Sequence, residues 1–409
     1  MRTRTIALLA ARVVIVAGAV ALARLPSSSQ WIEHHYSEAL YPFLQHLITP
    51  VSNVLPFAVF DLLVAGTILG VVVWWIASIR RAGQGRRVRA LGLLFLNTVV
   101  LGAGFFLLFE LTWGLNYLRV PISERLDYDR TRVTREALDR LAVADIERLN
   151  AESPPAHAVA WPATKEWANR LIPSFDAVIK ATGNPRGMTP GRVKTSIFNL
   201  YMSASGIEGF TDPLALEVIL DSRLLPFEQP FALAHEWAHL AGFADESEAN
   251  FIALLTCIRS NDAGVRYSGW LELYLSLPPR RPPVSSTALE PEHDRHAGLE
   301  AKQPPANSSA SPGTPQAGAP VEISGPRLDA QVIADLKAVA ERRQKEVKPW
   351  VSDAEWRIYD KFLKANGVQA GVASYGLFIR LMLGTKFDPG WTPAMRSGAG
   401  PKPVQSSSF

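Results

Sequence analysis

The sequence predicts a mainly α protein in which N-terminal transmembrane helices precede a mostly helical α+β domain outside the cytoplasm. Three observations support this prediction. Apolar residues crowd the first third of the 409-residue chain, whereas polar and charged residues dominate from about Pro121 onward. An arginine-rich stretch separates two long apolar segments. Helical periodicity then recurs through the polar part, with one short β-branched stretch among the helices.

Residues 1–112 form the predicted membrane region, which contains three apolar segments. The first, residues 5–25, is short for a spanning helix, and "ALA" at its end would suit a signal-peptidase site. A cleaved signal peptide and an uncleaved anchor are therefore both open. Residues 59–78 and 90–111 are each long enough and apolar enough to span a lipid bilayer.

The stretch "RRAGQGRRVR", residues 80–89, carries five arginines between the second and third apolar segments. By the positive-inside rule this loop is cytoplasmic, so the chain after about Thr112 lies outside. The orientation is the same whether the first segment is cleaved or retained. We therefore expect a multi-pass membrane protein with an extracytoplasmic domain.

The polar part begins with helical patterns. Residues 135–152 follow a candidate N-cap at Thr134, and residues 164–181 contain Pro173, which is expected to break or kink the helix. Residues 215–224, "ALEVILDSRL", alternate in places and predict a strand. No basic stripe interleaved with aromatic residues appears, despite the net charge of +4, so a nucleic-acid partner is not expected.

A compositional break divides the polar part. Residues 278–326 are dominated by Pro, Ser, Ala and Gly, a composition that cannot bury enough apolar surface to fold. We expect a disordered insertion within one domain, which comprises residues 113–277 and 327–395 and is followed by a disordered tail, residues 396–409.

Three helices are expected after the insertion. "PRLDAQVIADLKAVAERRQKEV" is amphipathic, and the next helix begins near Ser352 and Glu355, which have capping-box spacing, and stops at Gly367. "VASYGLFIRLMLG" predicts a core helix. The single cysteine, Cys257, lies in the apolar phase of an earlier helix and is expected to be a small buried hydrophobe.

The stretch "FALAHEWAHLAGFADESEANFIALL", residues 231–255, contains the pattern HExxH. His235 and His239 share one helix face, so both imidazoles can bind one ion, and Glu236 can activate a water over the same site. Burying these polar groups in an apolar helix without a ligand would be costly. The pattern predicts a Zn²⁺ site with Glu236 as catalytic base, on a helix that ends at Gly242.

A catalytic zinc site needs a third protein ligand, and three acidic residues follow the helix. Asp245 would give HExxHxxGxxD, a variant of the metzincin pattern, and Glu248 is a further candidate. Glu246 shares a helix face with Asn250, which could then orient an imidazole, whereas Glu248 points roughly 160° away from Glu246. This geometry favours Glu246 and leaves the other two as alternatives.

Four stretches together resemble an uncharacterised bacterial membrane family, catalogued as domain of unknown function 3810: "WGLNYLRVPISERL", "HEWAHLAGFADESEANFIALL", "RYSGWL" and "YDKFLKANGVQAGVASYGLFIRLML". The resemblance covers the chain except the Pro/Ser-rich insertion, which departs from the family pattern. It implies several membrane helices followed by a zincin-like domain in a bacterial inner membrane. Among relatives the position of Asp245 is often basic whereas both glutamates recur, which counts against Asp245 as a ligand.

The segment that starts at Glu246 also resembles the ExxAD motif of membrane gluzincins of the prenyl-protease type. In those proteins the first glutamate binds zinc, and the last acidic residue supports a zinc histidine. Here Asn250 stands at the last position. The resemblance implies the same two roles for Glu246 and Asn250.

Two functions follow from these observations. The first is a membrane-anchored zinc metallopeptidase that hydrolyses a peptide or protein substrate, with residues 215–220 offering a strand edge to the peptide and Tyr267 as a candidate donor to the oxyanion. The second is a non-proteolytic scaffold or sensor with a structural zinc. Glu236 favours the enzyme, because a structural site has no need of a glutamate between its histidines.

Overall fold

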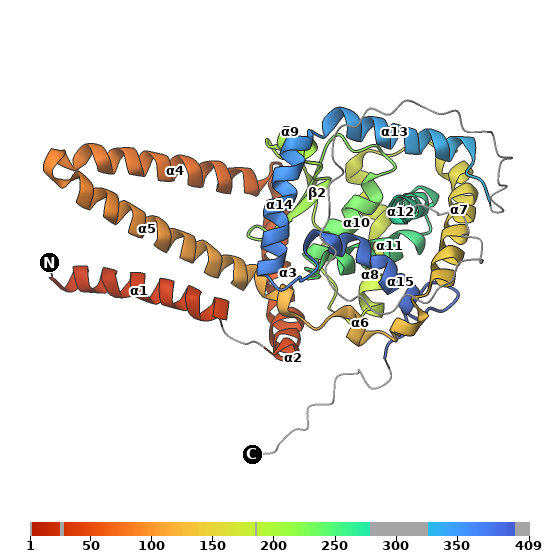
Figure 1. Ribbon diagram of the computed structural model, residues 1–409, viewed down its shortest axis with the longest axis horizontal. Helices are drawn as coiled ribbons and strands as arrows, with labels where there is room; N and C mark the ends of the chain where they lie inside the picture. Colours follow the sequence, from red (N-terminus) through yellow and green to blue (C-terminus); the bar gives the residue numbers. More distant parts are fainter. Residues whose placement is uncertain (1, 25–27, 185, 279–325, 397–409) are drawn as a thin grey trace, which may run out of the picture. The chain divides into compact units, whose positions relative to one another are not determined.

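The computed structural model describes residues 2–24, 28–184, 186–278 and 326–396. Most of these residues are helical, and the one sheet within these ranges has three short strands (Figure 1). This composition confirms the predicted mainly α class. The segments expected to be disordered lie outside the described residues, apart from 278, 326 and 396.

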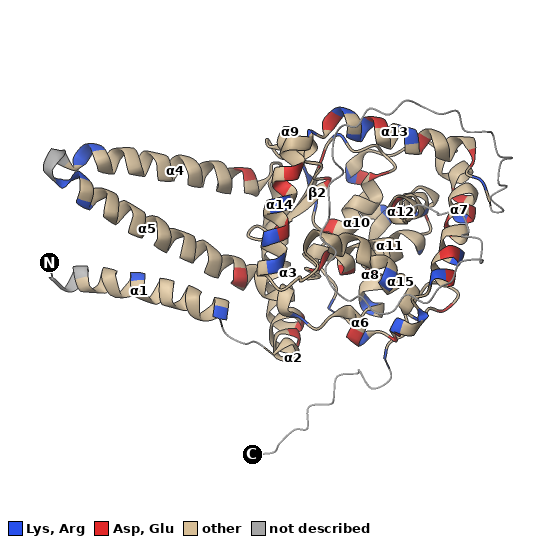
Figure 2. Cartoon of the chain, viewed as in Figure 1, with Lys and Arg blue, Asp and Glu red and all other residues tan. Residues whose placement is uncertain are grey.

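Three of the described helices are long and apolar enough to cross a membrane: α1 (Arg2–Arg24), α4 (Val59–Arg81) and α5 (Gly83–Thr112). Helix α1 packs along α5. The indole Nε1 of Trp75 donates a 3.1 Å hydrogen bond to Thr98 Oγ1 and joins α4 to α5. Figure 2 shows Lys and Arg at the turn between α4 and α5, whereas the bodies of both helices are almost free of charge.

The segment between α1 and α4 forms α2 (Ser29–Ile32), a π-helical stretch (Glu33–Leu40) and α3 (Tyr41–Val54). The sequence boundaries assign these residues to the membrane region. In the structure Ile32, Tyr36 and Tyr41 are buried in the main core of the domain. The Tyr41 hydroxyl donates a 2.8 Å hydrogen bond to the carbonyl of Leu240. Aromatic burial and satisfied polar groups therefore attach this segment to the domain.

The polar part begins with two short elements, α6 (Ile122–Arg125) and a 3₁₀ turn (Arg130–Arg132). Two longer helices follow, α7 (Arg135–His157) and α8 (Trp167–Ala181). Thr134 caps α7 as predicted, because its hydroxyl accepts from the N–H of Ala137 at 3.2 Å. Of the two outcomes expected at Pro173, a break or a kink, the break is wrong, since α8 runs through Pro173 without interruption. Pro173 and Asn169, four residues earlier, are both exposed, so the carbonyl that loses its partner can bond to water.

The sheet has the order β1-β3-β2 and consists of β1 (Val193–Lys194), β2 (Gly209–Asp212) and β3 (Glu217–Leu220), with α9 (Asn199–Ser205) between β1 and β2. Strand β3 confirms the strand predicted within residues 215–224. It is wholly buried and central, parallel to β1 and antiparallel to β2. The expectation that residues 215–220 offer a free edge is therefore wrong, because both edges of β3 already carry hydrogen-bonded neighbours.

The core of the domain is built on α10 (Gln229–Leu240), α11 (Glu246–Ile258) and α12 (Ala263–Ser276). Helix α11 contacts both of the others, and α7 packs along α12. Cys257 is fully buried on α11, as expected. Helices α10 and α11 bury most of their residues, which fixes the position of the polar groups they carry.

The C-terminal part consists of α13 (Ala330–Glu346), α14 (Pro349–Ala365), a 3₁₀ stretch (Gly371–Leu377) and α15 (Phe378–Gly384). Helix α14 begins at Pro349, so the predicted capping role of Ser352 is wrong; proline is favoured in the first helical turn and starts the helix earlier. Gly367 follows α14 with φ of +93°, which confirms the predicted stop. The expected last core helix is interrupted, because only residues 378–384 are α-helical.

Candidate metal centre

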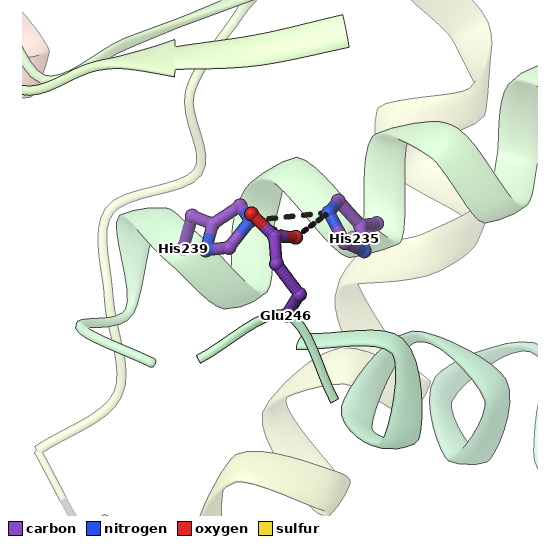
Figure 3. Close-up of side chains that lie close together, drawn as sticks. All are labelled: His235, His239 and Glu246. Atoms are coloured by element: carbon purple, nitrogen blue, oxygen red, sulfur yellow. Dashed lines mark hydrogen bonds and ion pairs between the residues drawn. The ribbon is translucent and has the colours of Figure 1, made fainter. Parts of the chain in front are cut away.

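Helices α10 and α11 bring three metal-binding side chains together (Figure 3). His235 and His239 project from one face of α10, and Glu246 reaches them from the first turn of α11. Gly242 makes the turn between the helices with φ of +86°, and a Cβ at this position would lie 3.0 Å from the Tyr41 ring. A residue with a side chain would therefore be strained in conformation and crowded against the Tyr41 ring.

The three ligand atoms form a nearly equilateral triangle, which we call the His–His–Glu triangle. The Nε2 atoms of His235 and His239 lie 3.1 Å apart. Glu246 Oε2 lies 3.2 Å from His235 Nε2 and 3.3 Å from His239 Nε2. Ligand atoms bound 2.0–2.1 Å from one tetrahedral zinc ion would lie roughly 3.3 Å apart. The triangle therefore has the dimensions of three corners of a zinc site.

Hydrogen bonds on the far side of each imidazole define which nitrogen carries the proton. His239 Nδ1 lies 2.8 Å from the carbonyl oxygen of Phe243, and His235 Nδ1 lies 2.7 Å from Asn250 Oδ1. The Asn250 amide is oriented by its own donation to the carbonyl of Tyr375 at 3.1 Å. Because both oxygens only accept, the ring protons belong on Nδ1, which leaves a lone pair on each Nε2.

Lone pairs that converge in this way need a positive charge between them. Burial lowers the pKa of His239, but the neighbouring Glu246 carboxylate outweighs burial and raises it to about 9. Burial favours the neutral form of Glu246, yet the two imidazoles reverse this effect and hold the pKa of the carboxyl well below its usual range. A divalent cation would stabilise all three groups at once without a second proton on either ring.

The other two acidic candidates lie away from the triangle. Asp245 caps α11, and its carboxylate accepts from the N–H groups of Ser247 at 2.8 Å and Glu248 at 3.3 Å. Glu248 points to the opposite side, where its carboxylate accepts from the N–H of Ile122 at 2.6 Å. Of the three candidates, the structure brings only Glu246 to the two histidines.

Glu236 lies beside the triangle without joining it. Thr211 on β2 donates a 3.0 Å hydrogen bond to Glu236 Oε2, and burial raises the pKa of this carboxyl. A Cβ at Gly209 would lie 2.9 Å from Glu236 Oε1. A glycine at the start of β2 therefore lets the strand pass directly over the glutamate.

A single cavity of about 940 Å³ contains His235, His239, Glu236 and Glu246 in its wall. Apolar and aromatic side chains make up most of the remaining wall. A concave apolar site with a few convergent polar groups is the usual form of a ligand-binding site.

Two tyrosines that sequence reasoning missed also line this cavity. The Tyr359 hydroxyl donates a hydrogen bond to Glu246 Oε1, and the Tyr375 ring lies 6.3 Å from the His235 ring. Both follow the insertion, far along the chain from HExxH, so no local pattern marks them. Tyr267, the predicted oxyanion donor, is instead fully buried away from the cavity, and its hydroxyl donates to Asp335 at 2.5 Å. That prediction is wrong because α12 turns Tyr267 toward α13.

The family model described as "Protein of unknown function (DUF3810)" matches residues 36–277 and 321–383. The chain belongs to this family. No curated protein and no solved structure matched the chain. The family membership confirms the resemblance seen in the sequence motifs.

The stretch "WGLNYLRVPISERL", which lies within the matched residues, bonds the backbone near the His–His–Glu triangle. Trp113 Nε1 donates to the carbonyl of His239 at 3.1 Å, and Arg119 donates to the carbonyl of Gly242 at 2.8 Å. Arg119 also forms a buried 2.6 Å ion pair with Glu33. Residues that precede α4 and residues that follow α5 therefore hold the turn between α10 and α11, a role that the sequence alone did not indicate.

Proposed function

We propose that this chain is a membrane-anchored zinc-dependent metallopeptidase with a zincin-like domain on the extracytoplasmic side. The convergence of the His–His–Glu triangle and the separate Glu236 carboxylate in one cavity carries the proposal. A structural zinc site is closed by protein ligands, whereas a catalytic site keeps one position open beside a base. Three ligands facing a cavity match the catalytic arrangement.

His235, His239 and Glu246 would hold the zinc ion. When bound, zinc would act as a Lewis acid that polarises a carbonyl and lowers the pKa of water. Glu236, held by Thr211, would take the proton from the attacking water and deliver it to the leaving amine. Asn250 and Tyr359 would position His235 and Glu246, respectively, because each bonds the atom of its partner that faces away from the other two ligands.

Strand β2 is the element we propose for binding the substrate backbone. In the described part of the chain, β2 pairs with β3 on one side only. Its Thr211 hydroxyl also bonds the Glu236 carbonyl at 2.8 Å, so the strand runs beside α10. A peptide added to the free edge of β2 would pass the triangle in an extended conformation.

The arginine-rich turn between α4 and α5 supports a cytoplasmic position for that turn and an extracytoplasmic position for the domain. Packing of α1 along α5 supports a retained anchor over a cleaved signal peptide. We infer a multi-pass protein of a bacterial inner membrane, with three spans and no nucleic-acid partner.

The proposal is tested on the purified full chain in detergent, with zinc measured by mass spectrometry and hydrolysis measured on fluorescent casein. Glu236→Gln should retain zinc and the fold but lose activity by roughly 10²- to 10⁴-fold, the usual size of general-base catalysis. His239→Ala should lose the metal.

Two results would count against this function. Wild-type protein that binds no zinc would remove its basis. Zinc binding together with unchanged hydrolysis in Glu236→Gln would exclude the mechanism, and zinc binding without any hydrolysis would favour the alternative of a scaffold or sensor with a structural zinc.

A further inference from the structure

Helix α3 has its polar side toward the protein. The Gln45 side chain accepts from the N–H of Thr189 at 2.9 Å and donates to the carbonyl of the same residue at 2.7 Å. Thr49 donates to the carbonyl of Leu216 at 2.8 Å. Both side chains are buried. This is the reverse of a helix on the surface of a water-soluble domain, which buries its apolar side.

The opposite side of α3 exposes large apolar residues. Phe43, Leu47, Val51 and Val54 follow one another at steps of four, four and three and therefore form one stripe. Their exposed fractions are 63%, 57%, 64% and 79%. Helix α3 lies in the chain between α1 and α4, two of the candidate membrane spans. An exposed apolar stripe at this position is typical of a helix that lies on a lipid surface.

Two further helices, α9 and α14, expose large apolar residues. Leu200 of α9 is 68% exposed, and Ile358 and Trp350 of α14 are 65% and 78% exposed. Helices α9 and α14 contact each other. Figure 1 shows α3, α9 and α14 on the side of the domain from which α4 and α5 extend. We call these three residues, together with the α3 stripe, the apolar face. Its exposed tryptophan, Trp350, is of the residue type that is enriched at the headgroup layer of a bilayer.

The cavity of the metal centre extends to this face. Phe60 and Val64 of α4 and Phe109 of α5 line the same cavity as His235. The Phe109 ring lies 6.1 Å from the ring of Phe362 on α14. The cavity therefore runs from the His–His–Glu triangle to the domain-side ends of two candidate spans, where its wall is apolar.

We propose that the substrate is a polypeptide anchored in the same membrane and cut immediately outside its membrane segment. This inference deepens the proposed function and rests on it. The apolar face holds the domain against the bilayer. The end of the cavity that is lined by α4 and α5 admits the anchored substrate chain from the lipid. Anchoring enzyme and substrate in one bilayer raises their effective concentration. The free edge of β2 is therefore sufficient to bind the substrate backbone.

The position of the apolar face is tested without any activity measurement. Full-length protein is reconstituted in phosphatidylglycerol–phosphatidylethanolamine vesicles with one cysteine, Leu200→Cys or Ile358→Cys, carrying an environment-sensitive dye. Cys257 is fully buried and stays unlabelled. Nitroxide lipids should quench both labels. The matched control is Ile333→Cys on α13, which is 53% exposed and should keep its fluorescence. Equal fluorescence at all three positions would overturn the inference.

The substrate class is tested with a degenerate peptide library attached to a transmembrane helix in those vesicles and with the same library free in solution. The anchored library should be cut near its anchor, roughly 10²-fold faster than the free one. Val64→Trp should slow that cleavage roughly tenfold or more by obstructing the cavity, because small displacements of a substrate cost large factors. Leu69→Trp, on the exposed part of α4, should not.

The outcomes separate this inference from the proposed function. Equal cleavage of both libraries would refute membrane-anchored substrates and leave the peptidase standing. Cleavage of neither library would refute the peptidase and with it this substrate class, whereas the quenching result would still establish or exclude the membrane-facing surface.

Discussion

The hydroxyl of Tyr359, on α14, donates a hydrogen bond to Glu246 Oε1, whereas the other carboxylate oxygen, Oε2, belongs to the His–His–Glu triangle. A partner at this position restricts the rotation of the carboxylate and directs Oε2 toward His235 and His239. Residues that bond metal ligands in this way typically contribute 10- to 100-fold to metal affinity.

Tyr359→Phe should therefore weaken zinc binding by roughly 10- to 100-fold while leaving the fold intact. Competition with a zinc chelator measures the change. The matched control is Tyr267→Phe, which removes a buried hydroxyl that bonds Asp335 away from the cavity. That variant should be less stable but should keep its zinc affinity; equal losses of affinity in both variants would contradict the role of Tyr359.

Glu246→Gln and Glu248→Gln form a second matched pair. Loss of an anionic ligand should weaken zinc binding at Glu246, and excess zinc should partly restore it. Glu248→Gln should keep zinc, because its amide oxygen can still accept from the N–H of Ile122, which the carboxylate now bonds at 2.6 Å. Zinc content after dialysis distinguishes the two. The ligand assignment would be reversed by metal loss in Glu248→Gln alone.

Membrane topology is tested with reporter fusions. A reporter that is active only outside the cytoplasm should be active when fused shortly after Arg130 and inactive when fused at residues 83–85. The physical reason is the cluster of arginines on both sides of the α4–α5 turn, which disfavours translocation of that turn. Activity at residues 83–85 and none after Arg130 would place the domain in the cytoplasm.

A buried carboxyl predicts pH-dependent stability. Asp145 of α7 is fully buried, its oxygens have no hydrogen-bond partner in the described part of the protein, and burial raises its pKa to about 8. The unfolded chain has an ordinary aspartate pKa of about 4. Between these values the folded state binds more protons, so stability falls as the pH rises through this window.

Asp145→Asn should reduce this fall and raise the Tm at pH 9 relative to wild type, with a smaller difference at pH 5. Differential scanning fluorimetry in detergent measures both. Asp139→Asn, on the exposed side of the same helix, is the control and should follow the wild-type pH dependence. A wild-type Tm that does not depend on pH between these values would show that Asp145 is not the titrating group.

Several elements could be predicted because their cause is local. The two long apolar segments, the Thr134 cap, the Gly242 turn and the strand within residues 215–224 each follow from a period, a cap or a special backbone angle. The helix-face relation between Glu246 and Asn250 was likewise readable, since residues four apart on a helix lie together. The errors at Pro173 and Ser352 arose where solvent exposure or a neighbouring proline outweighed the local signal.

The sequence by itself determined that His235 and His239 share one helix face, because residues four apart lie on the same side of an α-helix. Only the tertiary structure decided that Glu246 reaches the histidines while Glu248 bonds Ile122, since that choice depends on how α11 packs. It also decided that β3 is central, that Tyr359 replaces Tyr267 near the site, and that α3 turns its apolar side outward. These relations join residues far apart in the chain, where pairing is selected by burial and hydrogen bonding across the whole fold rather than by neighbouring residues.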